Sequence, residues 1–253
     1  MKKNNCQRDE LRNYINQMLE VERFQDYCPN GLQVQGKNTI RKIVTGVTAS
    51  RGLIEQAIEA KADAILVHHG WFWKNDESPI VGQLYNRLKL LMDNDISLFA
   101  YHLPLDAHPK VGNNAQLGKV AGWKHTGQSS IKSLISLGEP RTVQSLEKFA
   151  ANLGKSLGRE PLVIGDKSRK IKKIAWCTGA AQSYFDAAIL EGVDVFISGE
   201  VSEPTFHLAQ ESGVAYIAAG HHATERFGVS ALGEALAKKF GITHQFIDIT
   251  NPV

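Results

Sequence analysis

Cysteine is scarce in this sequence, and the sites that depend on it are therefore not expected. The chain has 253 residues and three cysteines, Cys6, Cys28 and Cys177, which lie far apart and form no Cys-x-x-Cys pair. This spacing supports neither a disulfide framework nor a cysteine-based zinc site. We expect all three to be ordinary reduced thiols.

Long apolar runs are also missing. No stretch reaches the roughly 18 apolar residues that a membrane-spanning helix needs, and the basic start "MKKNNCQRDELRNYINQ" is not followed by an apolar block. We therefore expect neither a membrane span nor a secretory signal peptide, and we expect a cytoplasmic protein.

Strong positive charge is missing as well, since the formal net charge is only +3. The basic run "KSRKIKK" at 167–173 is typical of a solvated turn before a strand. A nucleic-acid partner is not expected at this charge. The sequence also has neither a G-x-x-x-x-G-K-[ST] loop nor a G-x-G-x-x-G motif, so any nucleotide would have to be held by other groups.

Strand and helix patterns alternate along the first half. Helical spacing of apolar residues predicts a helix over 8–21, and a loop follows it. The next segments predict strands at 42–50, 63–69 and 96–106, with helices at 51–62 and 83–95 between them. This order predicts an α/β fold with mostly parallel sheets covered by helices on both faces.

The same pattern returns at an offset of 131 residues. "RKIVTGVTASRGLIEQAIEAKADAIL" then faces "KKIAWCTGAAQSYFDAAILEGVDVFI" without a gap, which matches Asp63 with Asp194. Chance similarity between two generic βα units is the alternative, but the repeated order of elements favours duplication. We expect two related three-layer α/β halves, approximately 1–126 and 127–253, whose ends could be intertwined, with a metal site between them at the carboxyl ends of the strands.

Histidines concentrate at those strand ends, where ligands gather in open α/β sheets. The stretches "VHHG", "YHLPLDAH" and "AAGHHATE" contain six of the nine histidines. His68 and His69 can serve one site if their strand ends there, and Gly70 permits a turn. In the third stretch a helix is expected to start, which puts His221 and Glu225 on one face, one turn apart.

Each of these features alone has an ordinary structural explanation. A histidine pair is more often a surface or core feature, an H-x-x-x-E spacing is more often a side-chain pair, and Asp106 could cap a turn. Their convergence favours a metal site. Imidazole and carboxylate without thiolate suit Zn, Mn, Fe, Co or Ni, and five ligands exceed one tetrahedral site, so we expect two divalent transition-metal ions per chain.

The chain resembles the dinuclear-metal-centre proteins called GTP cyclohydrolase I type 2 homologs, or the Nif-three-like family. The resemblance covers essentially the whole chain and rests on "PNGLQV" at 29–34, "ILVHHG" at 65–70, "HLPLDAH" at 102–108, "SGEVSEPTFH" at 198–207 and "AGHHATE" at 219–225. It implies that the metal pair is bound by His68, His69, Asp106, His221 and Glu225, with Glu225 as the bridge. It also implies a ring-shaped homohexamer.

Four more residues are candidates for positions around the ligands rather than on the metals: His102, Glu200, His207 and His222. Trp71, Phe72 and Trp73 directly follow the histidine pair and could wall a pocket or stack on a base, although core or subunit packing is the simpler interpretation.

Two functions remain open at this point. The first is a metal-dependent hydrolase acting on a nucleotide or a related phosphorylated heterocycle, since two metals supply an activated water and polarise the bond to be cleaved. The second is a non-catalytic protein that stores or delivers metal, or a ring-shaped interaction partner. A substrate-shaped pocket beside the metals would discriminate between them.

Overall fold

The computed structural model describes residues 4–74, 76 and 79–253. Its contacts divide the chain into two compact units: unit 1 contains residues 1–112 and 228–250, and unit 2 contains residues 113–227 and 251–253. Among the described residues, no helix is both long enough and apolar enough to cross a membrane.

These units differ from the expected halves 1–126 and 127–253 at both ends. Residues from Asn113 onward belong to unit 2 because Leu117 packs into the core of that unit. The chain then returns to unit 1, where Thr243 to Phe246 add a parallel strand beside Lys42 to Thr45. This pairing joins strands that lie far apart in the chain, so local periodicity does not reveal it.

Unit 1 is built on a five-stranded sheet of order β15-β4-β5-β6-β2, in which β2 alone is antiparallel to its neighbour. Its elements are β1 (Cys6–Gln7), α1 (Arg8–Met18), the 3₁₀ helix η1 (Val21–Arg23), β2 (Gly31–Val34), β3 (Thr39–Ile40), β4 (Lys42–Thr48), α2 (Arg51–Glu59), β5 (Ala64–His69), α3 (Gly82–Asp93), β6 (Ser97–Ala100), α4 (Leu103–Ala107) and β15 (Thr243–Phe246). Helix α9 (His221–Phe240) begins in unit 2 and continues into unit 1.

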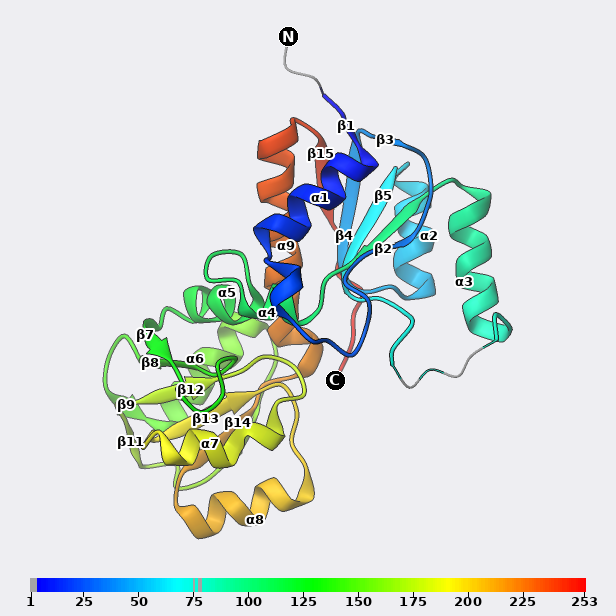
Figure 1. The fold of residues 1–253 in the computed structure, drawn as a ribbon. Coiled ribbons are helices and arrows are strands. Elements are labelled where there is room, and N and C mark those ends of the chain that lie inside the picture. The colour runs from blue at the N-terminus through cyan, green and yellow to red at the C-terminus, as the bar shows by residue number, and fades with distance from the viewer. Residues whose placement is uncertain (1–3, 75, 77–78) are drawn as a thin grey trace. The chain divides into compact units, whose positions relative to one another are not determined.

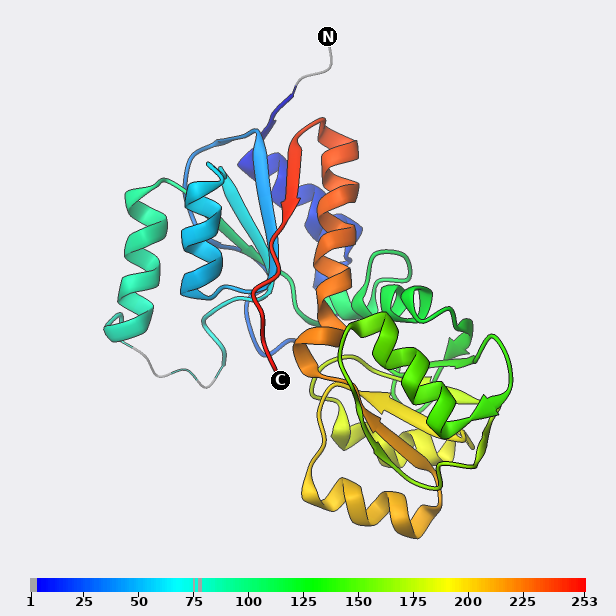
Figure 2. The same cartoon turned by 180° about the vertical axis from the view of Figure 1, so that it is seen from behind.

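Helices cover both faces of this sheet (Figures 1 and 2). On one face, α2 and α3 pack through residues such as Leu53 and Leu91 against Val44 and Ile65. On the other face, apolar residues of α1 and α9, among them Ile15, lie against the opposite side of the strands. Because both faces are buried, β4 and β5 are almost continuously apolar rather than alternating.

Unit 2 has a six-stranded sheet of order β10-β14-β13-β12-β8-β7, whose three central strands are parallel. Its elements are α5 (Asn113–Val120), β7 (Lys124–Gln128), β8 (Ser136–Glu139), β9 (Gln144–Ser145), α6 (Leu146–Leu157), β10 (Leu162–Ile164), β11 (Lys170–Ile171), β12 (Ile174–Trp176), the 3₁₀ helix η2 (Gln182–Tyr184), α7 (Phe185–Leu190), β13 (Val195–Ser198), α8 (Glu203–Ser212) and β14 (Ala215–Ala218). Helices α5 and α6 cover one face, and α7 and α8 cover the other.

The two units repeat the same β-α-β register. Ile43 pairs with Ala64 in the first, and Ile174 pairs with Val195 in the second, so both partners keep the offset of 131 residues. The third parallel strands follow the same order, with Ala64 beside Ser97 and Val195 beside Ala215. The α/β fold with mostly parallel sheets and helices in alternating layers is therefore confirmed, including the repeat expected from the sequence.

One predicted strand is shorter than expected. The segment 96–106 forms a strand only to Ala100, and after two further residues it turns into α4. Pro104 lies within the first two positions of that helix, where its missing N–H costs nothing. The break places His102 between strand and helix, at the carboxyl edge of the sheet.

Candidate metal centre

His68 and His69 lie at the carboxyl end of β5, where neighbouring segments hold both rings. His68 is fully buried, and its Nδ1 donates to the carbonyl oxygen of Tyr101 at 3.0 Å. The Nδ1 of His69 lies 3.3 Å from the hydroxyl of Thr48 on β4. Because β4 and β6 flank β5, successive histidines are each held from a different side, yet their ring centroids are only 4.6 Å apart.

Gly70 has a different role from the expected one. Its φ is not positive, so the turn after the histidines does not require glycine for backbone freedom. A Cβ at this position would instead lie 2.5 Å from the Cβ of Ala100 and collide with the side chain of Gln33. Gln33 itself binds both the N–H and the carbonyl of Trp71, at 2.7 and 3.0 Å.

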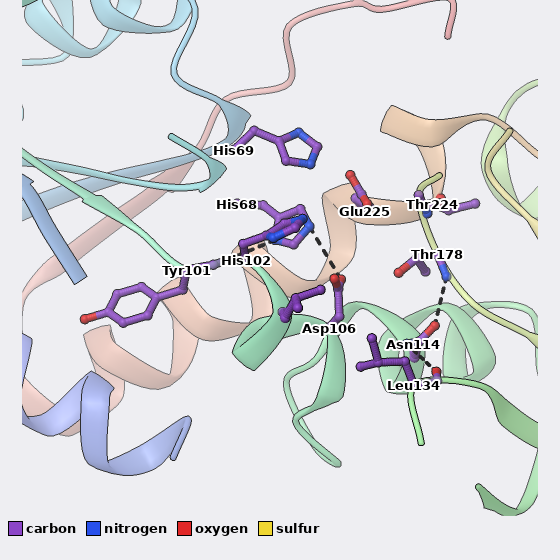
Figure 3. A network of polar contacts seen from close by, with 12 residues as sticks. His68, His69, Tyr101, His102, Asp106, Asn114, Leu134, Thr178, Thr224 and Glu225 are labelled. Atoms are coloured by element: carbon purple, nitrogen blue, oxygen red, sulfur yellow. Dashed lines mark hydrogen bonds and ion pairs between the residues drawn. The ribbon is translucent and has the colours of Figure 1, made fainter. Parts of the chain in front are cut away.

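Asp106 reaches the same edge from α4. Its Oδ1 lies 3.5 Å from Nε2 of His68, and its side chain is only 10% exposed. Figure 3 shows this carboxylate pointing towards the imidazole, while the phenol of Tyr101 points away. The His68 ring is therefore held by the Tyr101 carbonyl at one nitrogen and faces a carboxylate at the other.

His102 is held by Asp26, a residue that the sequence interpretation missed. The Nδ1 of His102 lies 2.7 Å from Oδ1 of Asp26, whose side chain is 3% exposed. Asp26 also accepts hydrogen bonds from Asn30 and from the backbone N–H groups of Tyr27 and Leu103. Burial raises the pKa of Asp26, but these hydrogen bonds, with that of His102 the largest, bring it below its usual value.

One ring nitrogen from each of His68, His69 and His102 lies within 4.8 Å of the other two. Figure 3 shows their rings gathered at one edge. Two nitrogens on one tetrahedral zinc ion are about 3.4 Å apart, given metal–nitrogen distances of about 2.1 Å. Small ring movements would close the difference, so this donor set fits a divalent transition metal.

Cys28, Asp26 and His102 form a second group with ligand-like spacing. Burial, with a smaller contribution from the Asp26 charge, raises the pKa of the Cys28 thiol to about 12. A metal binds the thiolate form, which is rare at neutral pH when the pKa is so high. This group is therefore a weaker candidate than the three histidines.

In unit 2, His221 and Glu225 occupy the first turn and a half of α9, as the H-x-x-x-E spacing predicts. Nε2 of His221 lies 3.1 Å from Oε2 of Glu225, and Nδ1 lies 2.7 Å from Oε1 of Glu200. Burial lowers the pKa of His221, but the two carboxylates, Glu225 more than Glu200, raise it to about 9. Gly179 packs so closely that a Cβ there would lie 2.1 Å from Oε1 of Glu225.

The remaining candidates fall in different surroundings. Glu200 contacts His221. His207 lies exposed on α8 and pairs with Glu203 at 2.8 Å, whereas His222 is buried and its backbone N–H donates to Val253. Neither His207 nor His222 belongs to a ligand-like group among the described residues.

The three aromatic residues after the histidine pair separate into different roles. Trp71 is a core residue whose indole N–H donates to the carbonyl of Ala49 at 3.1 Å. Phe72 is 40% exposed and adopts a φ of 64°. Trp73 meets the His102 ring edge-on, with centroids 5.1 Å apart. Of these three aromatic residues, only Trp73 therefore lies beside the histidines of the candidate site.

Comparison with known proteins finds relatives over nearly the whole length of the chain. A family model for Duf34/NIF3 (NGG1p interacting factor 3) matches residues 6–252. The chain is 53% identical over 237 residues to the "GTP cyclohydrolase 1 type 2 homolog" of Pseudomonas aeruginosa, covering 92% of this chain and 94% of that protein. It is 50% identical over 245 residues to the Escherichia coli K12 protein of the same name, covering 96% and 98%.

A solved structure of the protein ybgI, described as of unknown function, superposes with a TM-score of 0.95 at 48% identity, covering 98% of this chain and all of that one. The agreement thus extends over nearly the full length in both sequence and fold. The chain belongs to the Duf34/NIF3 family.

Proposed function

We propose that this protein is a metal-dependent hydrolase that binds two divalent transition-metal ions and acts on a nucleotide or a related phosphorylated heterocycle. The proposed ligands are His68, His69 and Asp106 from unit 1 with His221 and Glu225 from unit 2. The relatives' name, GTP cyclohydrolase 1 type 2 homolog, points to the same class of reaction.

The observation that carries this proposal is the way the imidazoles are held. The Nδ1 atoms of His68 and His221 donate to the Tyr101 carbonyl and to the Glu200 carboxylate. A histidine fixed in this way keeps the lone pair of its neutral form on Nε2, which is the usual arrangement of histidines that bind metals. A histidine that only fills space in a core does not need this orientation.

A bound pair of divalent ions would supply water activated near neutral pH and would polarise a carbonyl, amidine or phosphoryl oxygen. The residues of the chain contribute orientation and charge. Asp106 and Glu225 would offset the positive charge of the ions, and the Glu200 carboxylate would increase the electron-donating power of the His221 ring. The edge of Trp73 and the exposed ring of Tyr27 offer apolar surface beside His102, where a planar base could pack.

The experiment is a metabolite screen of protein loaded separately with Mn, Zn or Fe. Each hit is repeated with Glu225→Gln, which keeps the side-chain size and removes the negative charge. We expect turnover that is abolished by a chelator and falls by orders of magnitude in the variant, because the charge that offsets the ions is gone.

Turnover that persists in Glu225→Gln or in the presence of chelator would place the reaction elsewhere. If the fully metallated protein turned over none of a broad metabolite set, metal storage or delivery, or a role as an interaction partner, would replace the hydrolase proposal.

We also propose that the chain assembles as a homohexamer, as the family resemblance implies. Native mass spectrometry would then give about six times the chain mass of 27.9 kDa. A monomer at micromolar concentration would contradict this part of the proposal alone.

A further inference from the structure

We propose that Tyr27 and Trp73 determine the substrate specificity of the proposed reaction by stacking on a flat aromatic heterocycle, such as a nucleotide base. This inference rests on the proposed function, since it concerns the substrate that would meet the candidate metal centre. It deepens that proposal by assigning the residues that distinguish a heterocycle from a sugar phosphate without a base. Neither residue is a candidate metal ligand.

Both aromatic side chains lie beside His102 at the carboxyl edge of the unit 1 sheet. The ring centroids of Tyr27 and His102 are 6.5 Å apart, and those of Trp73 and His102 are 5.1 Å apart. The Trp73 ring also lies 6.1 Å from that of His69. Within the described part of the chain, Tyr27 and Trp73 make no ring contact with each other. A planar group bound over His102 would therefore meet both of them.

The exposure of the two rings leaves them available to a ligand. Tyr27 is 61% exposed and Trp73 is partly exposed. A single exposed aromatic residue is ordinary, but two that contact the same histidine form an apolar surface, and such surfaces mark binding sites. Every nucleic-acid base has a π face that stacks on aromatic side chains, whatever its hydrogen-bonding groups. A flat heterocycle is therefore the ligand class that this surface fits.

Phe72 gives Trp73 its position. Its φ of 64° is a left-handed conformation that bulky residues rarely adopt. The chain changes direction at this residue, so that Trp71 is buried in the core while Trp73 meets the His102 ring. Strained backbone of this kind persists only where surrounding contacts hold it, and it concentrates at ligand-binding sites.

Hydrogen bonds on both sides of Phe72 hold this turn. Before it, the Gln33 side chain binds the N–H and the carbonyl of Trp71 at 2.7 and 3.0 Å. After it, the Trp73 N–H donates to the Asp76 carboxylate at 3.2 Å, and the Asp76 N–H donates to the Trp73 carbonyl at 2.8 Å. The direction of the Trp73 side chain is thus set before any ligand arrives.

Tyr27 is joined directly to the same loop. The backbone N–H of Lys74 donates to the Tyr27 carbonyl at 2.6 Å. The Tyr27 N–H donates to Oδ1 of Asp26 at 2.6 Å, and the same carboxylate oxygen lies 2.7 Å from Nδ1 of His102. Both aromatic residues and His102 therefore belong to one hydrogen-bonded framework. A ligand that binds there orders little additional backbone, which favours affinity.

Binding of four nucleotides, AMP, GMP, CMP and UMP, tests whether a base is recognised. Ribose 5-phosphate is the matched control ligand, because it has the phosphorylated sugar and no base. We expect calorimetry on the Zn-reconstituted protein to give at least one nucleotide an affinity about tenfold or more above that of ribose 5-phosphate, since stacking on aromatic residues contributes on this order.

Variants then identify the residues that stack. Trp73→Ala and Tyr27→Ala should each weaken nucleotide binding about 5- to 150-fold and leave ribose 5-phosphate binding unchanged. Trp73→Phe and Tyr27→Phe keep a flat ring and should restore most of the affinity. The matched control is Tyr85→Ala, which removes an aromatic side chain that is 49% exposed on α3 and should affect neither ligand. For any substrate turned over, the two alanine variants should raise KM more than they lower kcat.

Circular dichroism and native mass spectrometry of each variant check folding and assembly. If an alanine variant misfolds, Trp73→Leu and Tyr27→Leu take its place, because leucine keeps apolar bulk and removes the flat face. Their nucleotide affinity should then fall below that of the phenylalanine variants, and equal affinity would contradict the inference.

Three results would overturn the inference: wild type that prefers none of the four nucleotides to ribose 5-phosphate, variants that lose affinity for both ligands equally, and variants that bind nucleotides normally. In the last case, a lower oligomeric mass would identify the rings as subunit contacts. Ring-dependent nucleotide binding without any turnover would support this inference and contradict the hydrolase. Turnover with ring-independent binding would support the hydrolase and contradict this inference.

Discussion

Asp63 and Asp194 make the same contacts in the two units. The Oδ2 of Asp63 accepts the backbone N–H groups of Arg41 and Lys42 at 2.7 and 3.0 Å, and Oδ2 of Asp194 accepts those of Lys172 and Lys173 at 2.8 and 2.9 Å. Each aspartate stands just before the second strand of its β-α-β unit and ties it to the start of the first. Positions 131 residues apart therefore share these aspartate-to-backbone hydrogen bonds as well as the strand register.

We expect Asp63→Ala and Asp194→Ala each to lower the free energy of unfolding by about 1–3 kcal/mol, because two backbone donors lose a charged acceptor. Urea denaturation of both variants measures this loss. Asp93→Ala is the control, since Asp93 is exposed and pairs with Lys89 on the surface of α3. A loss no larger than that of the control would show that solvent replaces the carboxylate.

Asp194 also predicts a dependence of stability on pH. Burial raises its pKa, but hydrogen bonds from the backbone of Lys173 and Lys172 and from Arg169 hold it below the ordinary 3.8. Its stabilisation is therefore present above pH 3.8 and is lost as the pH falls through the lower pKa of the folded state. The difference in stability between wild type and Asp194→Ala should shrink on acidification, which denaturation curves at several acidic pH values would measure.

Replacing His68 or His221 by alanine should lower metal content while the chain stays folded. His68 lies at the carboxyl end of β5 and His221 is the first residue of α9, and neither side chain belongs to a hydrophobic core cluster of the described residues. Elemental analysis after reconstitution with Zn, Mn or Fe measures the effect, and wild type should carry up to two ions per chain. Fewer than one ion in wild type, or unfolding of the variants with metal retained in the soluble fraction, would contradict the assignment.

Metal binding by His221 should release a proton. In the metal-free protein Glu225 and Glu200 raise the His221 pKa to about 9, so the ring is protonated at neutral pH. A metal bound at Nε2 displaces that proton, and apparent affinity should therefore fall as the pH decreases below 9. Calorimetry in buffers of different ionisation enthalpy counts the proton, and Glu200→Gln should reduce the count near pH 8.

The raised pKa of His221 also makes the stability of the metal-free protein depend on pH. Because the folded-state pKa exceeds the ordinary 6.5, protonated His221 contributes stability fully below pH 6.5, and the contribution is lost as the pH rises through about 9. Between pH 6.5 and about 9, the melting temperature of the metal-free wild type should therefore fall more than that of His221→Ala. Equal declines would show that the two carboxylates do not hold the ring protonated.

Gly179→Ala should weaken metal binding without removing any ligand. A Cβ at this position would lie 2.1 Å from Oε1 of Glu225, and the φ of 68° adds strain. Gly158→Ala is the matched control, because its φ is 71° and its Cβ would meet nothing within 4 Å. We expect a similar backbone cost of about 1 kcal/mol in both variants, but a loss of metal affinity in Gly179→Ala only, as measured by chelator competition.

Several features followed from the sequence alone. Apolar periodicity placed the β-α-β order, and the offset between Asp63 and Asp194 indicated the repeat, because these signals are local or repeat at a fixed spacing. The pairing of His221 with Glu225 followed from helical geometry, in which residues four apart share a face. Family membership followed from short motifs whose order and spacing are specific.

Tertiary structure alone decided which groups hold those residues in place. Asp26 lies far from His102 in the chain, and only the antiparallel pairing of β2 with β6 brings its loop to the ring. His207 sits within a family motif, yet α8 places it on the surface with Glu203. The division of the chain likewise depended on β15 returning to β4. Periodicity reports which face of an element is buried, whereas partners across a sheet depend on register and chain topology, which no local pattern encodes.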